Sequence, residues 1–368
     1  MKKNPFGARL DAFACKLLDR GLDAAVIFNE ANVKALTGVD CDNAGLLVFA
    51  PPTPKHPNTP TPPHLPPRVV FHTDFRYVPM VHRIAPWLKV ADIKKLGGAR
   101  PFRAAGVRLA KIGYESSIAH ARYLKLEKTF PDATFTDVDA DLKALRAVKT
   151  PEELARLRAA EALNDRIWTL AQRKFKAGMT EREMARVIRH LMIEKGDGEA
   201  FETIVCVGRN AAECHHVPDD TVWTGKEPVL VDMGVKLDGY CSDMTRNLVP
   251  ARPSKLYRKV YDLVLGANLA AIAAAKPGMT TGALDKVARD YLAKAGFGKA
   301  FGHALGHGVG LEIHEAPAVA KKKKTVLEPG MAVTIEPGVY LEGNLGVRIE
   351  DLVLITATGC EVISHSAK

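Results

Sequence analysis

Four acidic residues in the second half of the chain lie in or beside strongly apolar segments. Asp232 follows the run Val-Leu-Val, Asp243 precedes a second apolar run, and Glu336 and Glu350 flank a turn at Glu-Gly-Asn-Leu-Gly. A carboxylate in such surroundings is costly unless a cation or a hydrogen-bond donor meets it. Because a hairpin at residues 234–240 would bring the two aspartates together, the pattern predicts a cation-binding site.

Histidines supply nitrogen ligands for the same site. His303, His307 and His314 fall within twelve residues that are interspersed with glycines, and His215 and His216 add two further candidates. One imidazole with four carboxylates is an oxygen-rich ligand set, which favours hard ions over the thiolate-rich sets of structural zinc. We therefore predict Mn²⁺, with Co²⁺, Fe²⁺ and Zn²⁺ as alternatives.

The segments that must position these residues are duplicated. The stretches that start at Lys176 and Lys276 align without gaps at an offset of 100 residues, and both contain Gly-Met-Thr, which ends one helix and caps the next. A β-rich stretch with a pair of acids follows each copy. Two related halves that face one another would enclose both pairs of carboxylates in one cleft, which suits two metal ions. The sequence thus predicts an α+β domain with internal pseudo-twofold duplication.

A second domain precedes this one, as expected for a chain of 368 residues. Its short apolar strands alternate with amphipathic helices, which indicates an α/β domain. Long helical periodicity begins near Ala144, and Thr150 followed by Pro151 is typical of a helix N-terminus. We predict domains at residues 1–148 and 149–368, with a proline-rich insertion at 51–67.

The composition argues against several other classes of protein. Six cysteines without a C-x-x-C pair are typical of reduced thiols, not of a disulfide framework. No stretch reaches the roughly 18 apolar residues of a membrane span, and the N-terminus lacks the apolar region of a signal peptide. The net charge of +10 has one dense run, the four lysines at 321–324, without interleaved aromatic residues. We therefore expect a cytoplasmic protein that binds neither a membrane nor nucleic acid.

Together these motifs resemble the pita-bread metallopeptidases, which include Xaa-Pro aminopeptidases, prolidases and methionine aminopeptidases. The resemblance covers nearly the whole chain and rests on FETIVCVGRNAAECHHVPDD, VDMGVKLDGYCSDMTRN, HALGHGVGLEIHE, IEPGVY and GVRIED. It implies a creatinase-like N-terminal α/β domain, a C-terminal pita-bread catalytic domain and two divalent metal ions. The implied metal ligands are Asp232, Asp243, His307, Glu336 and Glu350.

The resemblance also implies residues that contact the substrate, move a proton or brace a ligand. These catalytic residues are His215, His303, His314, Glu336 and Arg348. Arg348 would brace Asp232, and Tyr340 is similar to a tyrosine near the family's cleft. A homodimer is expected by the same analogy.

The implied function is hydrolysis of the bond that precedes proline in a peptide substrate, and two activities fit it. A dipeptidase (prolidase) must bind a free C-terminal carboxylate, normally with a cationic donor. This chain has Ala318 after HEAP, where many relatives have an arginine. That departure favours an Xaa-Pro aminopeptidase, with prolidase as the alternative. A non-catalytic binding protein on the same fold is a remote alternative, disfavoured because every ligand is present.

Overall fold

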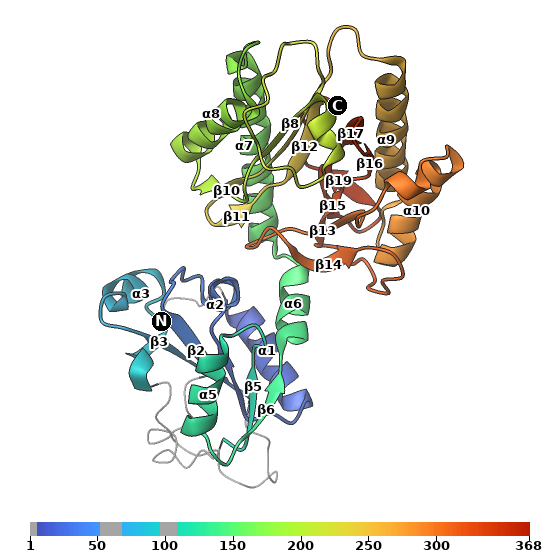
Figure 1. The fold of residues 1–368 in the computed structure, drawn as a ribbon. Coiled ribbons are helices and arrows are strands. Elements are labelled where there is room, and N and C mark those ends of the chain that lie inside the picture. Colours follow the sequence, from blue (N-terminus) through green and yellow to red (C-terminus); the bar gives the residue numbers. More distant parts are fainter. Residues whose placement is uncertain (1–5, 52–67, 96–108) are drawn as a thin grey trace. The chain divides into compact units, whose positions relative to one another are not determined.

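The computed structural model describes residues 6–51, 68–95 and 109–368 of the chain (Figure 1). The chain divides into two compact units, residues 1–146 and 147–368. Apart from Pro51, the proline-rich stretch that the sequence predicts as an insertion lies outside the described residues. No helix within the described ranges is both long enough and apolar enough to cross a membrane.

The first unit contains a mixed six-stranded sheet in the order β4-β3-β2-β1-β5-β6. Its strands are β1 (Ala24–Ile27), β2 (Ala44–Phe49), β3 (Val69–Thr73), β4 (Lys89–Asp92), β5 (Lys111–Tyr114) and β6 (Thr134–Asp137). Its helices are α1 (Gly7–Asp19), α2 (Glu30–Thr37), α3 (Val78–Ile84), α5 (His120–Thr129) and α6 (Asp139–Ala147). β1 pairs antiparallel with β2 and parallel with β5.

Helices cover both faces of this sheet, because successive side chains of a strand point to opposite sides. Ala25 and Ile27 pack into a core that includes residues of α1 and α2, whereas Ala24 and Val26 pack into a second core with α5. β1 is therefore buried along its whole length. The expected α/β architecture of the N-terminal part is confirmed.

A buried histidine in this sheet makes the stability of the first unit depend on pH. Burial of His72 in β3 lowers its pKa to about 4. The unfolded chain, with a histidine pKa of about 6.5, therefore binds more protons between these two pH values. We expect the free energy of unfolding to fall by about 3 kcal/mol as the pH decreases from 6.5 to 4, and His72→Gln to remove most of this loss.

The measurement is urea unfolding at several pH values, followed by the fluorescence of Trp87, the one tryptophan of the first unit, with Trp168 and Trp223 replaced by phenylalanine. His82→Gln is the matched control, because His82 is exposed on α3. An acid-dependent loss that is as large in His72→Gln as in the parent protein would contradict the assignment.

The second unit consists of two halves that each combine a helix pair with a sheet. The first half has α7 (Pro151–Lys174), α8 (Glu181–Lys195) and the sheet β12-β9-β8, made of β8 (Ile204–Val207), β9 (Val229–Met233) and β12 (Met244–Leu248). The second has α9 (Lys255–Ala274), α10 (Thr281–Lys294) and the sheet β14-β13-β15-β18-β19, made of β13 (Gly306–Gly308), β14 (Glu315–Val319), β15 (Ala332–Ile335), β18 (Asp351–Ile355) and β19 (Cys360–Val362).

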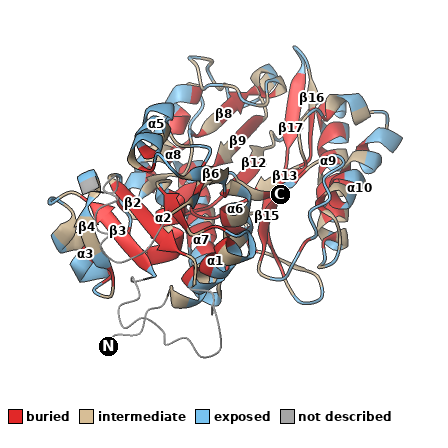
Figure 2. Cartoon of the chain, turned by 90° about the horizontal axis from the view of Figure 1, so that it is seen from below, coloured by how far each residue is buried: buried red, intermediate tan, exposed pale blue. Residues whose placement is uncertain are grey.

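Smaller ladders complete this unit. They are β11-β10-β7, made of β7 (Gly198–Glu199), β10 (Val235–Leu237) and β11 (Tyr240–Cys241), and the hairpin of β16 (Gly338–Leu341) and β17 (Leu345–Arg348). Each helix pair packs on the strands of its own half around a separate apolar core. Figure 2 shows mostly buried strands and exposed outer faces on helices such as α10.

The two halves repeat the same local structure at the predicted offset of 100 residues. Thr180 accepts a hydrogen bond from the backbone of Glu183 at the start of α8, and Thr280 does the same for Ala283 at the start of α10. The glycines two residues earlier, at 178 and 278, have φ values of 96° and 83°, which side chains other than glycine rarely adopt. The predicted internal duplication is confirmed.

Candidate metal centre

Paired strands bring the acids of each half together. In the first half, the register of β9 and β12 pairs Asp232 with Thr245, two residues beyond Asp243. In the second half, Glu336 directly follows β15 and Glu350 directly precedes β18, whose ends are paired. The β16-β17 hairpin lies between these two glutamates. Each pair of acids is therefore held by hydrogen-bonded strands of the second unit.

The structure places the five predicted metal ligands and the other predicted catalytic residues around one cavity of about 370 Å³. They are Asp232, Asp243, His307, Glu336, Glu350, His215, His303, His314 and Arg348. Phe201, Ile204, Ala304 and Ile313 provide an apolar part of the lining. Tyr340 is not among the lining residues, but its hydroxyl bonds two of them, His303 and Arg348.

Three residues from both halves could share one metal ion. Ligand atoms of Asp243, His307 and Glu350 all lie within 4.8 Å of one another. His307 Nε2 lies 3.5 Å from Asp243 Oδ2 and 3.4 Å from Glu336 Oε1. Its Nδ1 lies 3.1 Å from the carbonyl oxygen of Gly308, so the proton belongs on Nδ1 and the lone pair of Nε2 points at the acids.

The charges in the cavity fit a cation. Burial lowers the pKa of His307 to about 4, so the imidazole is neutral and does not compensate the acids. Burial, with repulsion from Asp232, raises the pKa of Glu336 to about 8. Burial and neighbouring carboxylates likewise raise the pKa values of Asp243 and Glu350 well above normal. Divalent metal ions would offset the repulsion between these carboxylates. The carboxylates and the neutral imidazole together are a ligand set that such ions can bind.

One oxygen atom provides independent support for this fit. Asp232 Oδ2 accepts a hydrogen bond of 2.6 Å from Arg348. Its Oδ1 is buried and has no hydrogen-bond partner within the described part of the chain. Buried acceptors are rarely left without a partner, because the loss of hydration costs free energy. A metal ion would satisfy this oxygen, so the residues present fit a bound divalent metal ion.

Arg348 links several parts of the cavity wall. Besides Asp232, its guanidinium donates to Thr245 Oγ1 at 3.0 Å, to the Tyr340 hydroxyl at 2.9 Å and to the carbonyl oxygen of Cys214 at 3.3 Å. Each of its three nitrogens therefore has a partner. The hydrogen bond to Asp232 is one of these contacts, and the role of Arg348 as a brace for this ligand stays a prediction.

Sequence reasoning missed two residues that hold the acids in place. The Thr245 hydroxyl donates to Glu350 Oε2 at 2.6 Å. Glu161 on α7 accepts from the backbone N–H of Asp243 at 3.0 Å, and burial raises the pKa of Glu161 to about 8. A signal for Glu161 was present, because it falls on the apolar stripe of α7 beside Leu157. A carboxyl group on that stripe indicates a buried polar partner.

The histidines of the cavity differ in how they are held. His303 has both ring nitrogens engaged, Nδ1 with the carbonyl oxygen of Ala304 at 2.7 Å and Nε2 with the Tyr340 hydroxyl at 2.9 Å. Burial lowers the pKa of His303 to about 4, so it is neutral. The ring of His314 stacks edge-on against His307 at 4.3 Å between centroids. The ring of His215 has no hydrogen-bond partner among the described residues and lines the cavity.

The second histidine of the His-His pair belongs to another cluster. His216 Nε2 lies 2.7 Å from Glu181 Oε2, and Asp219 completes a group that could hold a metal ion. The buried Glu181 also accepts from the backbone N–H groups of Val207 and Asp219 and from the Asn210 side chain. Both its oxygens are thus satisfied within the protein. This cluster therefore anchors the segment that carries His215, and His216 is not a candidate for the cavity.

Comparison with known proteins agrees with this geometry. A Lactobacillus helveticus Xaa-Pro dipeptidase is 44% identical over 255 residues, which cover 68% of this chain and 69% of that protein. The structure of an Xaa-Pro dipeptidase from Bacillus anthracis superposes with a TM-score of 0.90 at 31% identity, over 99% of this chain and 98% of that one. The X-Pro aminopeptidase from Thermotoga maritima MSB8 gives a TM-score of 0.82 at 29% identity, over 94% and 96%.

The match to families extends through both units. Residues 9–148 match the Creatinase/Prolidase N-terminal domain, and residues 155–357 match metallopeptidase family M24. The second match alone covers more than half of the chain. The resemblance that the sequence motifs suggested is confirmed, and so is the fold of a creatinase-like domain followed by a catalytic domain. By the match over residues 155–357, this chain belongs to metallopeptidase family M24.

Proposed function

We propose that this chain is an Xaa-Pro dipeptidase, a prolidase that cleaves dipeptides whose second residue is proline. The observation that carries the proposal is the complete set of candidate ligands in one cavity of a chain 44% identical to an Xaa-Pro dipeptidase. The sequence favours an Xaa-Pro aminopeptidase, because Ala318 stands where many relatives have an arginine. The relatives support the dipeptidase better, and the likeness to the Thermotoga maritima aminopeptidase keeps the aminopeptidase activity as the second candidate.

The proposed metal ligands are Asp232, Asp243, His307, Glu336 and Glu350, which would hold two divalent ions, with Mn²⁺ as the first choice. Such ions polarise the scissile carbonyl and lower the pKa of a water molecule. The proposed domain limits remain residues 1–148 and 149–368. A homodimer stays a prediction from the resemblance.

The chain's own residues would orient the substrate and move protons. His215 and His314 line the cavity and can donate to the oxygen that becomes negative during attack. The leaving nitrogen belongs to proline and carries no hydrogen in the peptide, so it must gain a proton as the bond breaks. We assign this proton transfer to Glu336. Arg348 would keep Asp232 in place, and Tyr340 would link Arg348 to His303.

The test is hydrolysis of Xaa-Pro, Xaa-Pro-Yaa and Xaa-Ala peptides by chelator-treated protein, with and without added Mn²⁺. We expect metal-dependent cleavage of Xaa-Pro only. Cleavage of the tripeptide at a comparable kcat/KM would favour the aminopeptidase. If neither proline peptide is cleaved by protein that demonstrably holds metal, the proposed substrate class is wrong.

A further inference from the structure

A dipeptidase needs a cationic group for the free carboxylate of its substrate, and the catalytic cavity does not provide an available one. This inference rests on the proposed function as a dipeptidase. Arg348 is the one arginine or lysine among the described residues that line the cavity. All three of its guanidinium nitrogens already donate to protein acceptors, including Asp232. The lysines at 321–324 line neither this cavity nor the adjoining one.

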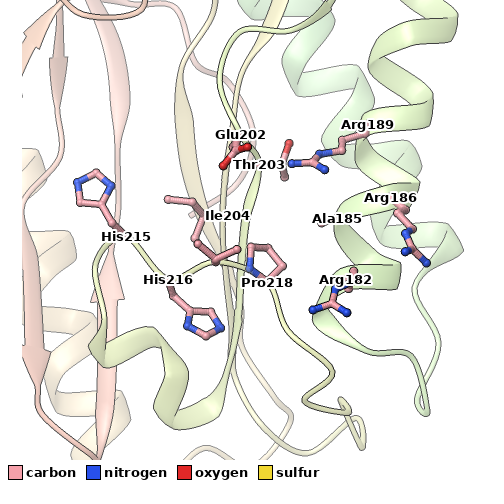
Figure 3. Close-up of a pocket in the computed structure, with 11 residues that line it drawn as sticks. Arg182, Ala185, Arg186, Arg189, Glu202, Thr203, Ile204, His215, His216 and Pro218 are labelled. Carbon is pink, nitrogen blue, oxygen red and sulfur yellow. The ribbon is translucent and has the colours of Figure 1, made fainter.

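A second pocket of about 370 Å³ adjoins the catalytic cavity (Figure 3). Glu202, Ile204 and His215 line both. Arginines 182, 186 and 189 of α8 line one side of this pocket, and the segment with His215, His216 and Pro218 lies opposite. In the view of Figure 3, the side chains of Arg182 and Arg189 extend toward this segment, whereas the guanidinium of Arg186 is directed away from it. The spacing of the arginines puts them on the same helix face. A peptide that contacts His215 in the catalytic cavity therefore lies next to an arginine-lined pocket.

The three arginines differ in how far their charge is already used. Arg182 pairs with Asp220 at 3.0 Å, and Arg189 pairs with Glu199 at 2.8 Å. Arg186 is exposed and has no ion pair or side-chain hydrogen bond within the described ranges. Its long flexible side chain carries a fork of donors that matches a carboxylate. Arg186 is thus the cation of this pocket that remains free for a ligand.

We propose that Arg186 binds the C-terminal carboxylate of the Xaa-Pro substrate, in the pocket between α8 and the segment that carries His215. His215 lines both cavities, so the substrate would place its scissile bond in one and its carboxylate in the other. Glu202, which lines both cavities, would repel the substrate carboxylate and so favour its placement on the side of α8. Arg186 would thus provide the positive charge for the carboxylate, which the alanine at position 318 cannot provide.

The first test compares Xaa-Pro with Xaa-Pro-amide, which lacks the carboxylate charge. Arg186→Gln should raise the KM for the dipeptide by about tenfold or more and leave the kinetics on the amide unchanged, since a hydrogen bond to a charged group contributes about 1.5–3 kcal/mol. Arg173→Gln is the matched control, because Arg173 is exposed on α7 and lines neither cavity. The control should resemble the parent protein on both substrates.

A second variant, Glu202→Gln, should have the opposite effect on substrate preference. It removes the negative charge of a residue that lines both cavities, so the ratio of kcat/KM for the dipeptide to that for the amide should rise. In Arg186→Gln the same ratio should fall. A ratio that stays unchanged in Arg186→Gln would overturn the proposal, even if the parent protein is a dipeptidase. Failure of the parent protein to cleave any Xaa-Pro dipeptide would instead refute the proposed function on which this assignment rests.

Discussion

Asp243→Asn should lower kcat/KM by more than about 100-fold and abolish tight binding of divalent ions. Loss of a residue that merely supports a metal ligand costs 10–100-fold, and Asp243 lies at the centre of the candidate ligand cluster. The substitution keeps the shape of the side chain and removes its charge. Hydrolysis of Xaa-Pro and metal content after dialysis against Mn²⁺ are the two measurements.

Asp243→Asn should also change the stability of the metal-free protein. Burial and the nearby Glu350 raise the pKa of Asp243 above its unfolded value, so the folded state binds more protons and loses stability as the pH rises above about 4. The variant should lose less stability over this range. Asp238→Asn is the matched control, because Asp238 is exposed in the turn between β10 and β11, five residues before Asp243. Full activity in metal-loaded Asp243→Asn would refute the assignment.

Arg348→Met should destabilise the metal-free catalytic unit by roughly 3 kcal/mol or more, because removal of one partner leaves a buried charge unpaired. The side chains of Arg348 and Asp232 are only 4% and 14% exposed. The variant also removes the donors that hold Thr245 and Tyr340, so the metal-loaded enzyme should lose activity as well. Urea unfolding and Xaa-Pro hydrolysis measure the two effects.

Arg158→Met provides the matched control for Arg348→Met. Arg158 pairs with Glu361 at 2.6 Å, but the two side chains are 44% and 43% exposed. Exposed pairs of this kind contribute about 1 kcal/mol or less, because water screens them. The control should therefore have nearly the stability of the parent protein. Equal losses in the two variants would contradict the expected cost of leaving the buried charge of Asp232 unpaired.

The sequence was sufficient to predict those features that depend on short stretches of chain. The duplication was visible because Gly-Met-Thr sets a helix end and a helix cap wherever it recurs. The candidate ligands stood out because acids next to buried strands need partners. Thr245 and Glu161 were missed, because the sequence does not identify their partners, Glu350 and the backbone N–H of Asp243, which lie 105 and 82 residues further along the chain.

The sequence was less informative about the choice between dipeptidase and aminopeptidase. The sequence argument rested on one position, Ala318, where a charge is absent. A free carboxylate can be met from any element whose side chain reaches it, so the absence of one arginine does not exclude a dipeptidase. Only the fold shows that α8 offers Arg186 next to the cavity that His215 lines.

The sequence by itself determined which residue types require a cation and which segments form helices and strands, because both follow from local chemistry and periodicity. The residue pattern alone left His215 and His216 as equal candidates, and the family resemblance implied His215. Only the tertiary structure shows the physical reason for the difference. His215 lines it, whereas His216 binds Glu181, which lies 35 residues earlier in the chain. Side-chain direction in a loop depends on such distant partners, since no repeating pattern within the loop sets it.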